Sequence, residues 1–135
     1  MFGKKKQPPI KSLIAQGSCI EGNLKFTHGL RIDGEVFGDI RAAEGGASIL
    51  VISELALVTG QIYADHVIIN GRVVGPVHAS ELLELQPKAK ILGDVSYKAL
   101  EMHQGAVISG QLRPTSPDVE EKPLLKLAAN NANSA

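Results

Sequence analysis

The sequence predicts an all-β protein whose chain coils into one parallel β-helix of six stacked units between two flexible tails. Three observations lead to this prediction. Glycines recur every 15–22 residues, apolar residues stand at fixed distances from each glycine, and the apolar positions within a unit alternate with a period of 2. A repeat of this length is typical of solenoids, and a period of 2 is typical of strands. The recurring glycines are Gly22, Gly38, Gly60, Gly75, Gly93 and Gly110.

Three apolar columns appear when the six glycines are aligned. Two residues before each glycine stand Ile20, Val36, Val58, Val73, Ile91 and Ile108. Two residues after each glycine stand Leu24, Ile40, Ile62, Val77, Val95 and Leu112. Eight residues before each glycine stand Ile14, Leu30, Ile52, Val67, Leu85 and Met102. We expect these columns to point into a common core, with the units stacked as rungs about 4.8 Å apart.

A fourth column, four residues before each glycine, holds small residues: Ser18, Gly34, Ala56, Gly71, Ala89 and Ala106. The segment "INGRVVGPVHA", residues 69–79, therefore has two glycines in the inward phase of one unit. We expect the small residues at corners of the coil, where a thin interior has no room for a large side chain. We expect a surface loop at "AAEGGAS", residues 42–48. A solvent-facing column is expected directly after the glycines: Asn23, Asp39, Gln61, Pro76, Asp94 and Gln111.

Charge and composition divide the chain into three parts. Residues 1–11 carry four lysines and no acid, and they are expected to form a flexible basic arm. Residues 12–113 form the predicted β-helix, with 8 basic and 11 acidic residues, and residues 114–135 form a disordered tail. An acidic body with 4% aromatic residues argues against nucleic-acid binding. Neither a signal peptide nor an apolar run of about 18 residues is recognised, which predicts a cytosolic protein.

The segments "LRIDGEVFGDI" and "VIINGRVVGPV", with "MFGKKK" at the amino terminus, closely resemble bactofilins, a family of bacterial cytoskeletal β-helix proteins. The resemblance covers roughly residues 12–113 and the amino-terminal peptide. It implies a right-handed, three-sided helix of about six rungs that polymerises end to end, without nucleotide, into non-polar filaments. It also implies a peripheral location on the inner face of the cytoplasmic membrane, with anionic lipid and cell-wall or morphogenesis proteins as partners.

The two terminal rungs are the predicted polymer interface. The apolar columns continue to the last unit at both ends, and the sequence shows no evident cap. An uncovered β-helix end offers unpaired N–H and C=O groups beside an apolar cross-section, so it tends to join another chain. The alternative is that the tails fold back as caps. The interface residues are Ile14, Ile20 and Leu24 at one end and Met102, Ile108 and Leu112 at the other.

The amino-terminal peptide is a candidate membrane anchor. Its predicted membrane-binding residues are Met1, Phe2, Lys4, Lys5 and Lys6. Three lysines near anionic lipid and one buried ring contribute about 5 kcal/mol, which corresponds to roughly millimolar affinity. A filament carries many copies of this arm, so avidity makes the attachment stable. The alternative is a basic segment that only keeps the protein soluble.

The outward position before each glycine carries Phe37, Val74 and Leu92 in three of the six units. These residues form a candidate apolar stripe for lateral bundling or for a client protein. Single apolar residues are also common on ordinary protein surfaces, and that is the alternative.

The alternative class of function is an enzyme, because left-handed β-helices of similar period include hexapeptide acyltransferases and zinc-dependent carbonic anhydrases. A zinc site needs histidines that converge from neighbouring rungs. The four histidines, His28, His66, His78 and His103, stand at scattered phases, so no metal site is predicted. The sequence has no GxxxxGK[ST] motif or nucleophile elbow, and Cys19 is expected to be an ordinary surface thiol. No catalytic residue and no cofactor are therefore predicted.

Overall fold

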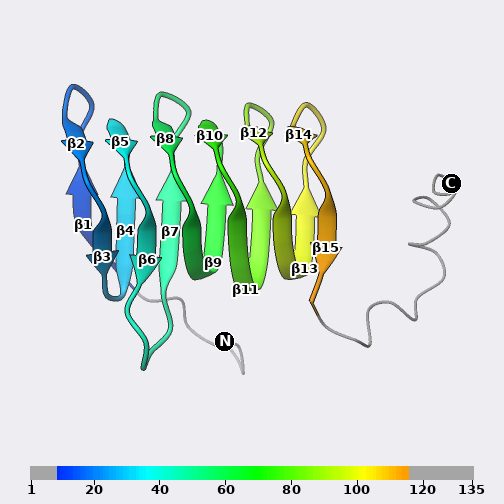
Figure 1. The fold of residues 1–135 in the computed structure, drawn as a ribbon, viewed down its shortest axis with the longest axis horizontal. Coiled ribbons are helices and arrows are strands. Elements are labelled where there is room, and N and C mark those ends of the chain that lie inside the picture. The colour runs from blue at the N-terminus through cyan, green and yellow to red at the C-terminus, as the bar shows by residue number, and fades with distance from the viewer. Residues whose placement is uncertain (1–8, 116–135) are drawn as a thin grey trace, which may run out of the picture.

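The computed structural model describes residues 9–115, and within this range the chain consists of fifteen short strands and no helix. The strands follow one another in rungs along the long axis of the molecule, from β1 at one end to β15 at the other (Figure 1). All strand pairs are parallel. In the same residues no helix is long and apolar enough to cross a membrane.

Each rung has three sides. The first rung comprises β1 (Ile10–Ile14), β2 (Cys19–Glu21) and β3 (Leu24–Phe26), and the second comprises β4 (Gly29–Ile32), β5 (Glu35–Phe37) and β6 (Ile40–Ala42). The third begins with β7 (Ile49–Ile52) and β8 (Leu57–Thr59). Three longer strands each close one rung and open the next: β9 (Ile62–Ile69), β11 (Val77–Leu85) and β13 (Val95–Met102). The remaining sides are β10 (Arg72–Val74), β12 (Lys90–Leu92), β14 (Val107–Ser109) and β15 (Leu112–Pro114).

Two sheets make the three faces of this solenoid. The six-stranded sheet, in the order β14-β12-β10-β8-β5-β2, forms the face that we call the second face. The nine-stranded sheet forms the other two, because β9, β11 and β13 run through the corner between them. The first face holds β1, β4, β7 and the later halves of these long strands, and the third face holds β3, β6, their earlier halves and β15. The predicted six-rung parallel β-helix is therefore confirmed.

The core is a stack of aliphatic side chains along the axis of the solenoid. Where a rung has neighbours on both sides, the inward residues are essentially inaccessible to solvent, as at Val58, Ile62 and Ile69. Each such residue lies in register with an aliphatic residue in the next rung, for example Val58 with Val73. The stacked columns give a narrow interior that is filled mainly by Val, Ile, Leu and Ala, with two aromatic side chains, Phe26 and Tyr97, among the buried residues of the described chain.

One predicted column had the wrong register. The residues that pair with Ile14 and Ile52 are Ile32 and Ile69, not Leu30 and Val67. The cause is the corner between the first and second faces, where the connecting turn has four residues in some rungs and two in others. The third rung turns through four residues that a hydrogen bond from Ala56 N to Ser53 O closes at 3.0 Å. The second and fourth rungs turn through only two residues, Asp33-Gly34 and Asn70-Gly71. In these two rungs the inward residue therefore stands six residues before the glycine, and the predicted spacing of eight reaches a residue two positions too early.

The corner between the second and third faces has a glycine in every rung, and the structural reason differs from the predicted one. Gly38, Gly60, Gly75 and Gly93 have φ between +141° and +155°, a region that L-residues rarely adopt. A Cβ on Gly60 would overlap the carbonyl oxygen of Gly38 in the rung below. The glycines are therefore required because the backbones of successive rungs touch at this corner, not because the interior lacks space.

The column after the glycines is more than a solvent face. The side-chain oxygen Oδ1 of Asn23 accepts a hydrogen bond from Asp39 N at 2.9 Å, and Asp39 Oδ1 accepts one from Gln61 N at 3.0 Å. Pro76 interrupts the ladder because it has no N–H to donate. A short carboxylate or carboxamide at this position thus ties one rung to the next.

A loop between β6 and β7 occupies residues 43–48, which confirms the predicted surface loop between rungs. It projects from the edge of the solenoid opposite the corner turns of β7 and β8 (Figure 1). Two reciprocal hydrogen bonds hold its end: Ser48 N donates to Asp65 Oδ2 at 3.1 Å, and Asp65 N donates to Ser48 Oγ at 3.0 Å. The extra residues in the longest spacing between glycines therefore form this loop at one corner, and the rungs on either side of it stay in register.

The glycine corner predicts a large difference between two alanine variants. Gly60→Ala adds a methyl group against the backbone of the next rung at a positive φ, so the free energy of unfolding should fall by roughly 2 kcal/mol or more. Gly46→Ala adds its methyl group to open space in the loop and should change the free energy little. Urea unfolding of both variants at one protein concentration checks this, and equal midpoints would contradict the role of the glycine corner.

Candidate polymerisation surfaces

The first rung presents an apolar end surface. The predicted residues Ile14, Ile20 and Leu24 come from β1, β2 and β3, and all three are only partly buried although they pack against the core. Leu13, on the same strand as Ile14, has 56% of its surface exposed, and sequence analysis did not single it out. The structure thus brings together all three predicted residues at this end.

The last rung presents a second apolar end surface. Met102 and Leu112 have 45% and 44% of their surfaces exposed, and Ile108 is partly buried. One rung further in, the residues in register with them are Leu85, Val95 and Ile91, and these are at most 1% exposed. The exposure at the end therefore comes from the missing next rung and not from a change in the type of side chain.

The backbone is also unpaired at the two ends. β1, β3 and β15 are outer strands of the nine-stranded sheet, and β2 and β14 are the outermost strands of the six-stranded sheet. Among residues 9–115, no further strand pairs with their outer edges. Such edges offer N–H and C=O groups for another strand, so each end combines an apolar cross-section with a template for strand pairing.

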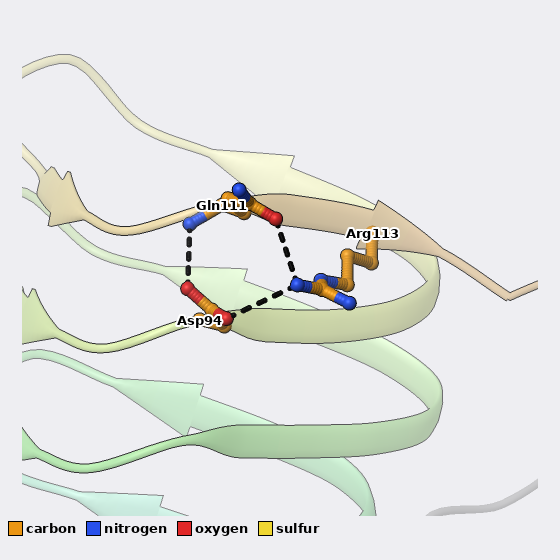
Figure 2. Close-up of polar contacts among 3 residues, drawn as sticks. All are labelled: Asp94, Gln111 and Arg113. Atoms are coloured by element: carbon orange, nitrogen blue, oxygen red, sulfur yellow. Dashed lines mark hydrogen bonds and ion pairs between the residues drawn. The ribbon is translucent and has the colours of Figure 1, made fainter.

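A polar cluster fastens the last strand to the rung before it (Figure 2). Gln111 N donates to Asp94 Oδ1 at 2.9 Å, continuing the ladder of the glycine corner. Arg113 Nη2 lies 2.7 Å from Gln111 Oε1 and 3.3 Å from Asp94 Oδ2, so its guanidinium group binds both neighbours. Leu112 lies between Gln111 and Arg113 in sequence, and the cluster therefore fixes a residue of the apolar end surface on an otherwise exposed strand.

The predicted apolar stripe lies on the second face. Phe37, Val74 and Leu92 are 40%, 38% and 55% exposed and occupy equivalent positions in β5, β10 and β12. Val74 and Leu92 are in adjacent rungs, whereas Thr59 separates Phe37 from Val74. The stripe is therefore exposed and in register, and it is interrupted once.

The third face carries a basic and aromatic row that sequence analysis missed. Lys25, Arg41, Tyr63 and His78 are in register in successive rungs. The Arg41 guanidinium lies 4.2 Å from the centroid of the Tyr63 ring, and the Tyr63 and His78 rings are 5.6 Å apart. This row borders a groove of about 710 Å³ beside the loop 43–48. In the sequence this row stands three residues after each of the first four recurring glycines.

One of the four histidines, His103, lies beside two carboxylates that the scattered positions of the histidines did not predict. Glu84, Glu101 and His103 place one potential metal-ligand atom each within 4.8 Å of one another, and Glu101 and His103 are exposed. Glu84 Oε2 already accepts a hydrogen bond from Gln86 at 2.9 Å. Burial lowers the pKa of nearby His66, and the Glu84 and Glu101 carboxylates partly oppose this effect.

The predicted membrane anchor, Met1, Phe2 and Lys4–Lys6, lies outside the described residues, as does most of the carboxy-terminal tail. The described residues form the two end surfaces and the three faces of the solenoid. The structure places Cys19 on the second face as an exposed free thiol.

Comparison with known proteins gives one consistent result. The family model described as "Bactofilin: Polymer-forming cytoskeletal" matches residues 12–113. Bactofilin BacO of Myxococcus xanthus (strain DK1622) is 28% identical over 111 residues, which cover 82% of this chain and 85% of the relative. The solid-state NMR structure of the cytoskeletal bactofilin BacA is similar with a TM-score of 0.66 and 31% identity, over 77% of this chain and 95% of that one.

The polar cluster at the last strand predicts a local loss of protection. Asp94→Ala removes the acceptor for the Gln111 N–H and the partner of Arg113, so the last strand should open more often, by about 1 kcal/mol or roughly fivefold in exchange rate. Asp94→Asn keeps the Oδ1 acceptor and should retain most of the protection. Hydrogen exchange of β15, compared with that of β8 in the same sample, measures the effect. Unchanged exchange in the alanine variant would show that the cluster does not hold the strand.

Proposed function

The chain belongs to the bactofilin family, whose members are polymer-forming cytoskeletal proteins, and on this premise we propose that it forms filaments by stacking its terminal rungs end to end. The observation that carries the proposal is the continuity of the apolar columns. Leu112 and Met102 are exposed at positions where the preceding rungs bury Val95 and Leu85 completely. A second copy placed on this end would supply the missing rung.

The size of this contact is sufficient for assembly. If each junction buries roughly 300–400 Å² of apolar surface, at about 25 cal/mol per Å² the gross stabilisation is about 8–10 kcal/mol before the entropy of association. Pairing of the unpaired edge strands gives the contact a defined orientation. Both contributions come from the polypeptide alone, so assembly needs no nucleotide or metal ion.

The filaments are proposed to be non-polar, as the sequence resemblance implies. In such a filament like ends meet, so the first rung contacts another first rung and the last rung contacts another last rung. The apolar residues at both ends of the solenoid are compatible with this arrangement, because each end surface has its own apolar cross-section to bury. A two-fold axis at each junction then relates the two copies.

The proposed site of action is the inner face of the cytoplasmic membrane, where the filaments organise cell-shape or cell-wall proteins. The support is the composition of residues 1–6, in which Met1 and Phe2 stand beside three lysines. A single arm binds weakly, and a filament with many arms binds firmly. Filament formation and membrane attachment are thus coupled in this proposal.

An enzyme of the left-handed β-helix type was the alternative class. Membership of a polymer-forming cytoskeletal family favours the scaffold. The two classes differ in a simple observation, because a scaffold of this kind forms filaments in plain buffer without nucleotide, acyl-CoA or zinc. Electron microscopy of the purified protein makes that observation directly.

The end-surface proposal predicts that charge at the last rung blocks polymerisation. Leu112→Arg and Ile108→Arg each place a guanidinium group in the apolar junction, where its desolvation is not compensated. Both variants should remain folded and soluble and should sediment as monomers. Ser109→Arg introduces the same charge on the outward side of the same rung and should still form filaments. Analytical ultracentrifugation and circular dichroism test all three, and filaments of unchanged length in both interior variants would refute the assignment.

The membrane proposal predicts that the arm can be removed without loss of the filament. Deletion of residues 2–6 should abolish co-sedimentation with vesicles that contain anionic lipid, while filaments in buffer remain unchanged. Vesicles of neutral lipid are the matched control and should bind neither protein strongly. Equal lipid binding by the full chain and the shortened chain would show that the attachment lies elsewhere.

A further inference from the structure

The second face carries a charge pattern that is complementary to itself. The outward side chains of its six strands form two rows, each in register from rung to rung. The row at the strand starts is Cys19, Glu35, Leu57, Arg72, Lys90 and Val107. The row at the strand ends is Glu21, Phe37, Thr59, Val74, Leu92 and Ser109. Acidic residues thus occupy the first two rungs, and basic residues occupy the fourth and fifth.

We propose that this face binds the same face of a second copy, with the two solenoid axes antiparallel. The two copies are related by a two-fold axis that runs along the strand direction, midway between the third and fourth rungs. This operation places the second rung of one copy opposite the fifth rung of the other. Glu35 then faces Lys90 of the second copy, and Phe37 faces Leu92 of the second copy. Each of these contacts occurs twice because the interface is isologous.

The remaining positions contain one mismatch and no repulsion. The antiparallel operation opposes Cys19 to Val107, Glu21 to Ser109 and Thr59 to Val74, and it sets one charge against an apolar side chain, Arg72 against Leu57. It places no two like charges directly opposite each other. A parallel arrangement, with the two-fold axis along the solenoid, would exchange the two rows. It would oppose Glu35 to Phe37, Arg72 to Val74 and Lys90 to Leu92, so three charges would face apolar side chains and no opposite charges would pair, whereas the antiparallel arrangement has one such mismatch and two ion pairs. The pattern therefore selects the antiparallel arrangement.

The charges of this face are available for a partner. Glu35, Arg72 and Lys90 are on the surface, and none of them makes an ion pair or a side-chain hydrogen bond with another residue of the described part of the chain. In rung order, Leu57 in β8 separates Glu35 from Arg72, so the chain does not neutralise these groups internally. An antiparallel partner would supply the opposite charge to each Glu35 and Lys90.

The other two faces are less suited to this contact. The third face carries positively charged side chains, Lys25 and Arg41, in one row, so two copies of this face would repel each other. The first face also has opposite charges in the second and fifth rungs, Arg31 and Glu84. Arg31 already binds Asp33 at 2.9 Å, and Glu84 already accepts a hydrogen bond from Gln86. The second face alone combines self-complementary charge with side chains that lack an internal partner among residues 9–115.

The size of the face determines what the contact joins. Six rungs at about 4.8 Å and strands of about 10 Å give a footprint of roughly 300 Å², well below the ~800 Å² per partner of a stable interface. Two monomers would therefore separate, whereas two filaments repeat the contact many times. The inference rests on the proposed polymerisation, and its product is a bundle. The loop 43–48 does not obstruct the contact, because it lies at the corner between the first and third faces (Figure 1).

A charge-swap experiment tests the pairing. Glu35→Lys and Lys90→Glu each place like charges opposite one another in an antiparallel bundle, and the double variant restores two opposite pairs. Low-speed sedimentation and electron microscopy measure bundles, and high-speed sedimentation measures all filaments. We expect the bundled fraction to fall at least severalfold in each single variant and to return in the double variant, with equal total filament in all four proteins. Added salt should separate wild-type bundles.

A cysteine pair tests the geometry independently. In a Cys19→Ser background, Phe37→Cys and Leu92→Cys place thiols three rungs apart in one chain, too far for an internal disulfide. The antiparallel contact brings the two thiols together, so mild oxidation of bundles should give covalently linked chains. Phe37→Cys alone in the same background is the control and should give none.

Three results would overturn the inference. These are equal bundling in all four charge variants, failure of the double variant to restore bundles, and wild-type filaments that remain single. The last result would leave the exposed apolar residues of the face to a protein of a different kind. Wild-type protein that forms no filaments at all would contradict the proposed function as well, and high-speed sedimentation distinguishes that case.

Discussion

The parallel pairing of each rung with the next is the interaction on which the rest of this structure depends. It sets the spacing of the rungs, and it requires that nothing separate them at the corners. The glycine corner shows the requirement directly, because Gly60 contacts the backbone of Gly38 where any Cβ would intervene. Once the rungs stack at this distance, residues in equal positions fall into columns, and the columns form a continuous core.

The same pairing explains why the sides and the ends of the molecule differ. Along the sides, each inward residue is covered by the rungs above and below it, as Val95 is. At each end of the solenoid the neighbouring rung is missing on one side. Leu112 is therefore exposed, although it is in register with the buried Val95. The Asp94 cluster adds hydrogen bonds where the apolar cover is lost. The two end surfaces therefore carry the same kinds of apolar side chain as the core, and at the last rung hydrogen bonds hold them in place.

Much of this fold could be predicted from the sequence because a solenoid repeats its physical constraints in every rung. The columns beside the glycines and the three residues of each end surface followed from spacing alone. The register of the first face could not be predicted in this way. The turn at Asp33-Gly34 has two residues and the turn ending at Ala56 has four, and only the strand pairing distinguishes the two lengths. The Asn23–Asp39 ladder was also missed, since it depends on a side chain reaching the backbone of another rung. The charge pattern of the second face stands three residues before each glycine, an outward position that no apolar periodicity marks in the sequence.

The two corners that flank the second face differ in how they accept changes of chain length. The glycine corner has the same short connection in every rung, whereas the opposite corner turns through two residues at Asn70-Gly71 and four residues where Ala56 closes the turn. Insertions and deletions of two residues are thus compatible with the stack along one edge of the prism and incompatible along the other. A change of two residues in loop length along the tolerant edge would leave both end surfaces unaltered, because the rungs on either side of the loop keep their register.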